Sequence, residues 1–199
     1  LGQKWGAWKT RFYTMGLRAK TTFGDWRLSG GVFRHIVDSR KSFNTLFVEA
    51  QGDGDARYLV AIHPRRNTAS NAGEVRLSRQ FDEGPRHHVV HLSVKGRTRV
   101  GDFGGEEVLD FGPVTVGEVP PRFPEPDVEF GEETSDEARQ ATAGIAYHGR
   151  WEAVGEIRVG LQKTRYRKTI EPPEAPAIVT RANPWLYNGT LAINLAKGL

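Results

Sequence analysis

Two long alternating runs within residues 137–168, separated by one short break, constrain the fold of this chain more than any other feature. In the first run Ile145 and Tyr147 alternate with small or polar residues, and in the second Val159 and Leu161 do the same. A period of two is typical of a β-strand with one apolar face. Strands of soluble sandwiches usually stop after about five or six residues, whereas these runs continue for roughly ten or more. That length is what a tilted strand needs to cross a bilayer, so the pattern predicts a membrane-spanning antiparallel pair.

The composition is compatible with such strands. The chain has 199 residues and is 38% hydrophobic, and a transmembrane barrel keeps its average hydropathy low because only alternate side chains meet lipid. No apolar run reaches the ~18 residues of a transmembrane helix, and the absence of cysteine excludes disulfides and thiolate metal sites. Residues 1–5 lack a starting Met and an apolar signal segment, so we expect an excerpt or a processed chain.

The charge is distributed unevenly. Residues 101–137 hold twelve acidic residues and one basic residue, Arg122, although the net charge of the whole chain is +4. The basic residues elsewhere are spread through the alternating segments. Nucleic-acid binding needs clustered Lys and Arg on one face, so the pattern argues against nucleic acid as a partner.

The alternation predicts nine strands in an up-and-down order. We expect them at residues 11–23, 26–36, 42–50, 56–63, 72–81, 86–97, the two halves of 137–168, and 184–196. The turns near residues 24, 51, 82 and 151 are short, and the connections near 38, 64, 101–137 and 169–183 are longer and polar. Short turns at one rim and long loops at the other are typical of outer-membrane barrels, in which the short turns are periplasmic. Residues 99–137 are then a long acidic extracellular loop.

Aromatic residues support the same interpretation, because they fall near the ends of the expected strands, where outer-membrane barrels carry interfacial girdles. They are Trp26, Phe81, Tyr147, Trp151, Tyr166, Trp185 and Tyr187.

Residues 73–97, 142–168 and 183–195 resemble the barrel of TonB-dependent outer-membrane receptors in strand spacing, turn class and the NPWLYN start of the last strand. The resemblance implies that residues 1–199 are an all-β segment of a barrel of about 22 strands in the bacterial outer membrane. It also implies uptake of a scarce nutrient, most often a ferric siderophore. The expected partners are this small-molecule cargo, outer-membrane lipid and lipopolysaccharide, and a TonB complex that acts through a plug domain.

The chain departs from the complete family pattern in two respects. Nothing in it matches a plug domain or an energy-coupling box, and nine strands is an odd number, whereas single-chain bacterial barrels have even numbers. We therefore expect a middle piece of a receptor with two unpaired sheet edges.

If the apolar parity faces lipid, several basic side chains point into the lumen. An inner wall of this charge favours anionic cargo, although each side chain could equally solvate the lumen or pair with a plug. These ligand candidates are Arg76, His87, His91, Lys95, Arg97, Arg150 and Arg158.

No catalytic, cofactor or metal site can be assembled from the sequence. His87 and His91 share a face, but four residues on a strand separate them by about 13 Å, too far for one ion. Residues 51–55 (QGDGD) resemble a calcium loop but lack its remaining ligands, so a tight turn is favoured.

Two other classes of protein remain open. The first is a soluble all-β ligand-binding module, either a sandwich or a lipocalin-like barrel, whose core would be the apolar parity. The second is a β-rich hydrolase that uses carboxylates of residues 101–137 as its acid and base.

Overall fold

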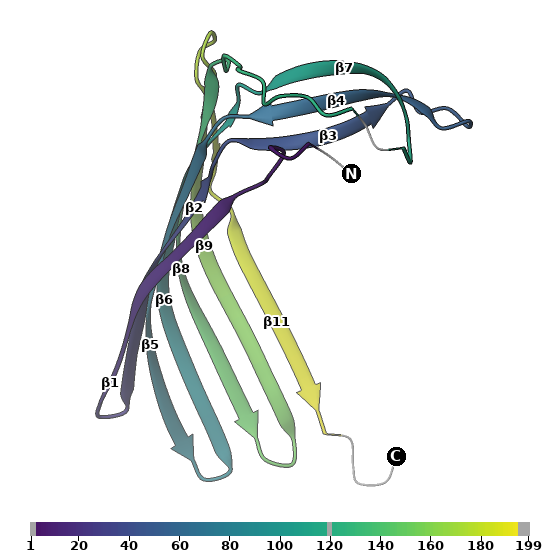
Figure 1. Cartoon of the computed structure of the whole chain (residues 1–199). Helices are drawn as coiled ribbons and strands as arrows, with labels where there is room; N and C mark the ends of the chain where they lie inside the picture. Colours follow the sequence, from purple (N-terminus) through teal and green to yellow (C-terminus); the bar gives the residue numbers. More distant parts are fainter. Residues whose placement is uncertain (1–2, 119–120, 195–199) are drawn as a thin grey trace.

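A computed structural model describes residues 3–118 and 121–194 of the chain (Figure 1). These residues form eleven β-strands in two antiparallel sheets, so the all-β, antiparallel class expected from the alternation is confirmed. No helix in the described part is long and apolar enough to span a membrane.

The larger sheet, which we name the wall sheet, is a meander of long strands. Its spatial order is β1-β2-β5-β6-β8-β9, and β10 and β11 both pair with β9. Its strands are β1 (Thr10–Phe23), β2 (Trp26–Ser39), β5 (Arg66–Glu83), β6 (Arg86–Gly104), β8 (Glu133–Trp151), β9 (Gly155–Glu171), β10 (Ile178–Ala182) and β11 (Trp185–Ile193). At about 3.3 Å per residue, the 19 residues of β6 or β8 extend roughly 60 Å, well beyond a bilayer core.

β10 and β11 are two parts of one strand. Both follow the same register along β9, with Ala182 opposite Tyr166 and Trp185 opposite Lys163. The pairing breaks at Asn183 and Pro184, because proline has no N–H to donate to the ladder.

The smaller sheet, which we name the cap sheet, has the order β3-β4-β7, with β3 (Ser42–Val48), β4 (Asp55–His63) and β7 (Glu107–Thr115). It folds away from the end of the wall sheet that carries the long connections (Figure 1). Its core consists of Tyr58, Val60 and Ile62, all at most 1% exposed. Around this core pack Trp5, Phe43, Leu109, Phe111, Val114, Phe123 and Val128.

The placement of residues 42–50 and 56–63 in the wall is wrong. β2 pairs with β5 along its whole length, from Trp26 opposite Arg79 to Ser39 opposite Arg66, so no strand can lie between them. The β3–β4 hairpin is therefore an insertion in a long connection. Its turn at residues 49–54 belongs to the cap sheet and not to the rim that carries the other short turns.

The strand count also differs, since β7 and β10 add two strands to the nine expected. Both lie in segments that were interpreted as loops, and several wall strands extend further than their apolar alternation. β6 continues to Gly104 and β8 begins at Glu133, so that only 105–132 connects them, with β7 inside. Leu195 and Ala196, which were assigned to the last strand, lie outside the described residues.

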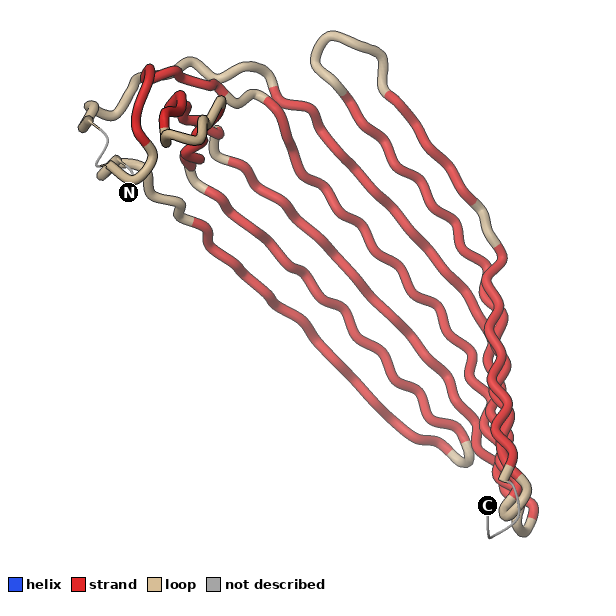
Figure 2. The backbone as a smooth tube through the Cα atoms, turned by 90° about the vertical axis from the view of Figure 1, so that its right-hand side faces the viewer, coloured by secondary structure: helices blue, strands red, loops and turns tan. Residues whose placement is uncertain are grey.

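The apolar parity of the wall sheet is not enclosed by other parts of the chain. Ile145, Val159 and Leu161 are 43–49% exposed. Figure 2 shows the wall strands as a single layer with nothing stacked on them below the cap sheet. This contradicts a sandwich, in which these residues would lie between two layers.

Candidate ligand-binding surface

The register of the wall sheet separates its side chains into a polar face and an apolar face. Directly paired residues share a face, so the pairs Lys95–Thr142 and Arg97–Gln140 place these four residues together. All seven ligand candidates lie on this polar face. On the other face one cross-strand row contains Leu28, Leu77, Leu92, Ile145 and Leu161.

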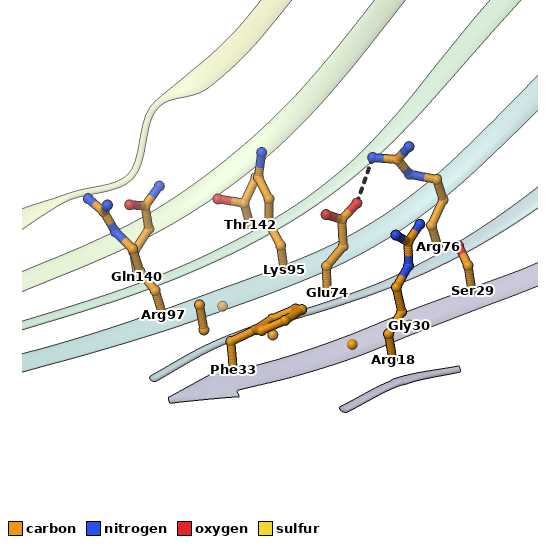
Figure 3. Close-up of a pocket in the computed structure, with 14 residues that line it drawn as sticks. Arg18, Ser29, Gly30, Phe33, Glu74, Arg76, Lys95, Arg97, Gln140 and Thr142 are labelled. Atoms are coloured by element: carbon orange, nitrogen blue, oxygen red, sulfur yellow. Dashed lines mark hydrogen bonds and ion pairs between the residues drawn. The ribbon is translucent and has the colours of Figure 1, made fainter. Parts of the chain in front are cut away.

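A hollow of about 780 Å³ lies on the polar face, and we name it the basic pocket. Four strands of the wall sheet contribute charged or amide side chains to it: Arg18 from β1, Glu74 and Arg76 from β5, Lys95 and Arg97 from β6, and Gln140 from β8. Figure 3 shows these side chains rising from the same side of the sheet.

The electrostatic balance of the basic pocket is positive. It holds four cationic side chains and one carboxylate, Glu74, which accepts a hydrogen bond from Arg76 at 2.7 Å. Within the described residues, no carboxylate lies within 4.0 Å of the side-chain nitrogens of Lys95 or Arg97. These two exposed cations are therefore available to an anion in the pocket.

Small residues form the floor of the basic pocket. Gly30, Gly31, Gly73 and Gly96 line it, together with the ring of Phe33. A Cβ at Gly31 would lie 3.2 Å from the Phe33 ring. Glycine therefore gives the hollow its depth and lets an aromatic surface lie beside the charges.

The remaining ligand candidates lie on the same face but nearer the short turns, outside the basic pocket. His87 contacts Asp82 at 2.9 Å, His91 hydrogen-bonds Ser78 at 2.7 Å, and Arg158 pairs with Glu156 at 3.2 Å. Arg150 lies directly opposite His87. The structure therefore gathers three of the seven candidates, Arg76, Lys95 and Arg97, into one hollow. Among the described residues, no group of three His, Asp or Glu side chains is placed to hold a metal ion.

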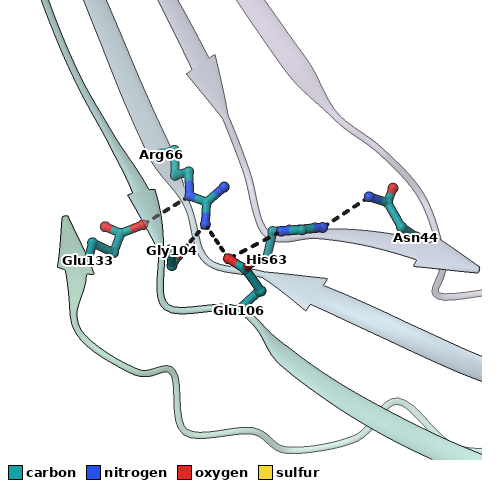
Figure 4. A network of polar contacts seen from close by, with 6 residues as sticks. All are labelled: Asn44, His63, Arg66, Gly104, Glu106 and Glu133. Atoms are coloured by element: carbon teal, nitrogen blue, oxygen red, sulfur yellow. Dashed lines mark hydrogen bonds and ion pairs between the residues drawn. The ribbon is translucent and has the colours of Figure 1, made fainter. Parts of the chain in front are cut away.

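A polar network joins the cap sheet to the wall sheet (Figure 4). Arg66, at the start of β5, donates hydrogen bonds to Glu133 at 3.1 Å, to Glu106 at 3.0 Å, and to the carbonyl of Gly104. Glu106 also lies 4.0 Å from His63, at the end of β4. Hydrogen bonds from its own backbone amide and from Arg66 lower the pKa of Glu106. The network therefore connects the ends of β4 and β7 in the cap sheet to the adjoining ends of β5 and β8 in the wall sheet.

Within the cap sheet, Arg57 donates a 2.6 Å hydrogen bond to Asp110, and this contact holds the pKa of Asp110 below its usual value. The acidic segment thus uses Glu106 and Asp110 in ion pairs with arginines. This arrangement does not resemble an acid and base pair facing a substrate.

No protein-family model and no curated protein matches the chain by sequence, but solved structures match its fold. The pyoverdine outer membrane receptor FpvA from Pseudomonas aeruginosa, bound to pyoverdine, has a TM-score of 0.75 at 14% identity, over 98% of this chain and 28% of the receptor. BauA, the ferric preacinetobactin receptor from Acinetobacter baumannii, gives 0.74 at 11% identity, over 89% and 27%. The ferric citrate transporter FecA, in its unliganded form, gives 0.62 at 13% identity, over 96% and 26%.

The chain has the fold of part of a TonB-dependent receptor barrel. It spans about a quarter of the length of each of these receptors. The resemblance recognised in the sequence is therefore confirmed at the level of the fold, and so is the all-β, antiparallel, up-and-down class. The structural neighbours are transport receptors and not enzymes.

Three charged or amide residues of the basic pocket are not among the candidates predicted from the sequence. Arg18, Glu74 and Gln140 complete the basic pocket. Glu74 and Gln140 have the same parity along their strands as the candidates Arg76 and Arg150, and Arg18 alternates with the apolar residues of its own strand. Parity alone could have placed them on the polar face. Their convergence with Arg76 and Lys95 depends on the strand register, which the sequence does not give.

Proposed function

We propose that this chain is part of an outer-membrane receptor that takes up a ferric siderophore or a similar anionic iron chelate. The polar face lines the lumen, the apolar face meets lipid, and the basic pocket contacts the cargo on its way through. The energy for uptake comes from a TonB complex acting through a plug domain.

One observation carries this proposal. The polar face gathers four cations from three strands into one hollow beside an aromatic ring, and two of them, Lys95 and Arg97, have no described carboxylate partner. Ferric chelates carry carboxylate, catecholate or hydroxamate oxygens and are commonly anionic. A lumen wall with this excess of positive charge attracts such ligands and raises their local concentration. The fold neighbours support the same class of cargo, since they are a pyoverdine receptor, a ferric preacinetobactin receptor and a ferric citrate transporter.

The test compares two double variants that each remove two positive charges. K95Q/R97Q changes the basic pocket, and R79Q/R86Q changes arginines on the apolar face near the short turns. The chain is folded into detergent micelles, and the affinity for ferric citrate is measured by calorimetry.

We expect K95Q/R97Q to weaken binding by about 5- to 30-fold, because two exposed charge contacts are worth about 1–2 kcal/mol together. R79Q/R86Q should bind as the parent chain does. Equal affinities for the two variants, or an affinity that does not depend on salt, would contradict the cargo role of the basic pocket.

The orientation of the receptor belongs to the same proposal. The rim with the short turns is periplasmic, and the cap sheet with residues 99–137 is extracellular. A protease added outside intact cells should then cleave the 105–132 connection and leave the β5–β6 and β8–β9 turns intact.

A further inference from the structure

A row of arginines crosses the apolar face between its hydrophobic residues and the cap sheet. Arg139 of β8 lies directly opposite Arg167 of β9, which in turn lies directly opposite Arg181 of β10. Directly paired side chains have Cβ atoms about 4.5–5.5 Å apart, and like charges in such positions destabilise a sheet. Arg165 lies on the same face of β9, two residues before Arg167.

These charges are poorly compensated by the protein itself. Arg139 is paired with Glu137 at 2.5 Å. In residues 3–118 and 121–194, no carboxylate lies within 4.0 Å of the guanidinium group of Arg165, Arg167 or Arg181. All three side chains are exposed. Such a cluster is stabilised if an external anion lies between the arginines.

The same cross-strand row continues with neutral hydrogen-bonding groups. Arg34 donates to Asn71 at 3.5 Å, and Asn71 donates to Thr98 at 3.3 Å. Thr98 pairs with Arg139, so the polar row is continuous from β2 to β10. It offers hydroxyl and amide groups beside the arginines, as a sugar headgroup would require.

A groove of about 1010 Å³ accompanies this row. Its floor contains the small residues Gly73, Gly96 and Ala141, which are paired with one another across the sheet, and Val32 and Leu17 continue the same row toward β1. The guanidinium groups therefore stand at one side of a hollow whose other side is apolar. A lipid has this division of properties, with a charged headgroup and hydrocarbon chains.

The depth of the row agrees with a headgroup. On β6 the mainly apolar residues of this face begin at His88, and Thr98 begins the polar row. These ten residues extend about 33 Å along the strand, or about 23–27 Å along the membrane normal at a tilt of 35–45°. Apolar bands of outer-membrane barrels are about 25 Å tall, so the arginines lie at its boundary. The boundary is the one nearer the cap sheet, on the side away from the short turns.

We propose that Arg167 and Arg181, with Arg139 and Arg165 beside them, bind a phosphate group of a membrane glycolipid whose acyl chain occupies the groove. Two guanidinium groups on neighbouring strands can bracket one tetrahedral phosphate, and each can donate two parallel hydrogen bonds to it. A carboxylate has only two oxygens in one plane, so it cannot accept paired hydrogen bonds from both guanidinium groups at once. The proposal rests on the proposed function in one respect, since the apolar face must meet lipid.

The test uses the full chain in detergent micelles with lipopolysaccharide as the probe. Three variants are compared: R167Q/R181Q, which removes the charges; R167K/R181K, which keeps the charges and removes the planar forks; and R79Q/R86Q, the control with the same charge change elsewhere on this face. The second probe is the same lipopolysaccharide after enzymatic removal of its phosphates, and the third is inorganic phosphate.

We expect R167Q/R181Q to bind lipopolysaccharide at least 10-fold more weakly than the parent chain, R167K/R181K to be intermediate, and R79Q/R86Q to be unchanged. Removing the phosphates should weaken binding to the parent chain by a similar factor. Inorganic phosphate at the same concentration should not compete, because it lacks the acyl chain. Unchanged binding by R167Q/R181Q, or full competition by inorganic phosphate, would overturn the proposal.

Insertion into phosphatidylcholine vesicles separates the two proposals. If the parent chain and R167Q/R181Q both insert but bind lipopolysaccharide equally, only the phosphate site is refuted. If the parent chain never inserts, the apolar face does not meet lipid, and both proposals fail.

Discussion

The substitution Leu161→Arg tests whether the apolar face of the wall sheet meets hydrocarbon. Leu161 is 43% exposed and lies in the cross-strand row with Leu92 and Ile145. It is six residues from Arg167, in the arginine row, and six residues from Gly155, at the start of β9. Six residues extend about 20 Å along a strand, or about 14 Å along the membrane normal at a tilt near 45°. Leu161 is therefore close to the middle of the band.

An arginine at the mid-plane of an outer-membrane barrel is unfavourable by about 2–4 kcal/mol, and near the interfaces by about 0–1 kcal/mol. A new arginine could also snorkel toward the boundary. The natural Lys163 already does so, since its ammonium group donates to the carbonyl of Asn183 and lies 4.9 Å from the Trp185 ring. Because Leu161 lies one row deeper, we expect its substitution to keep most of the mid-plane penalty.

The matched control is Gln162→Arg, the next residue in the chain, which lies on the polar face opposite Gly144. Both variants are folded into phosphatidylcholine vesicles and unfolded with urea, with tryptophan fluorescence as the signal. We expect Leu161→Arg to lower the free energy of unfolding by about 2–4 kcal/mol and Gln162→Arg to change it by less than about 1 kcal/mol. Equal losses, or a larger loss for Gln162→Arg, would refute the assignment of the two faces.

Three further predictions concern the cap sheet. Tyr58→Ala should destabilise this sheet by about 3–5 kcal/mol because the ring is fully buried, whereas Tyr58→Phe should change its stability by less than about 1 kcal/mol. Hydrogen exchange of β4 measures both effects. Similar effects of the two substitutions would contradict the packing role of the ring. Arg66→Gln removes the hydrogen bonds that join the two sheets. Hydrogen exchange should therefore increase in residues 105–106 and in the first residues of β5, while β9 stays protected. Unchanged exchange would show that the network does not hold the cap sheet in place. The Arg57–Asp110 pair should stabilise the cap sheet above about pH 4. This stabilisation should be lost as the pH falls through the lowered pKa of Asp110, because the carboxyl group of the unfolded chain binds its proton at a higher pH. Limited proteolysis between pH 3 and 6 measures this pH dependence of stability, which should disappear in Asp110→Asn.

The amino-acid sequence by itself determined the strands that carry the apolar face, and it determined their two faces. Along 143–148 and 157–162 successive residues lie alternately on the apolar face and on the polar face, so the order of the side chains in the sequence shows both faces directly. The short turns at Gly24 and Gly84 are equally local, because glycine there adopts positive φ angles of 55° and 60°. The seven candidates on the polar face follow from the same parity.

Only the tertiary structure decided which strands pair and which residues meet. The ends of β5, β6 and β8 nearest the cap sheet lack the apolar alternation, so their sequences resemble loops although their ladders continue. The β3–β4 hairpin alternates as the wall strands do, and the β2–β5 register alone excludes it from the wall. The basic pocket and the arginine row both arise across strands that are distant in sequence. Their geometry depends on register, a property of pairs of strands, which no single stretch of sequence contains.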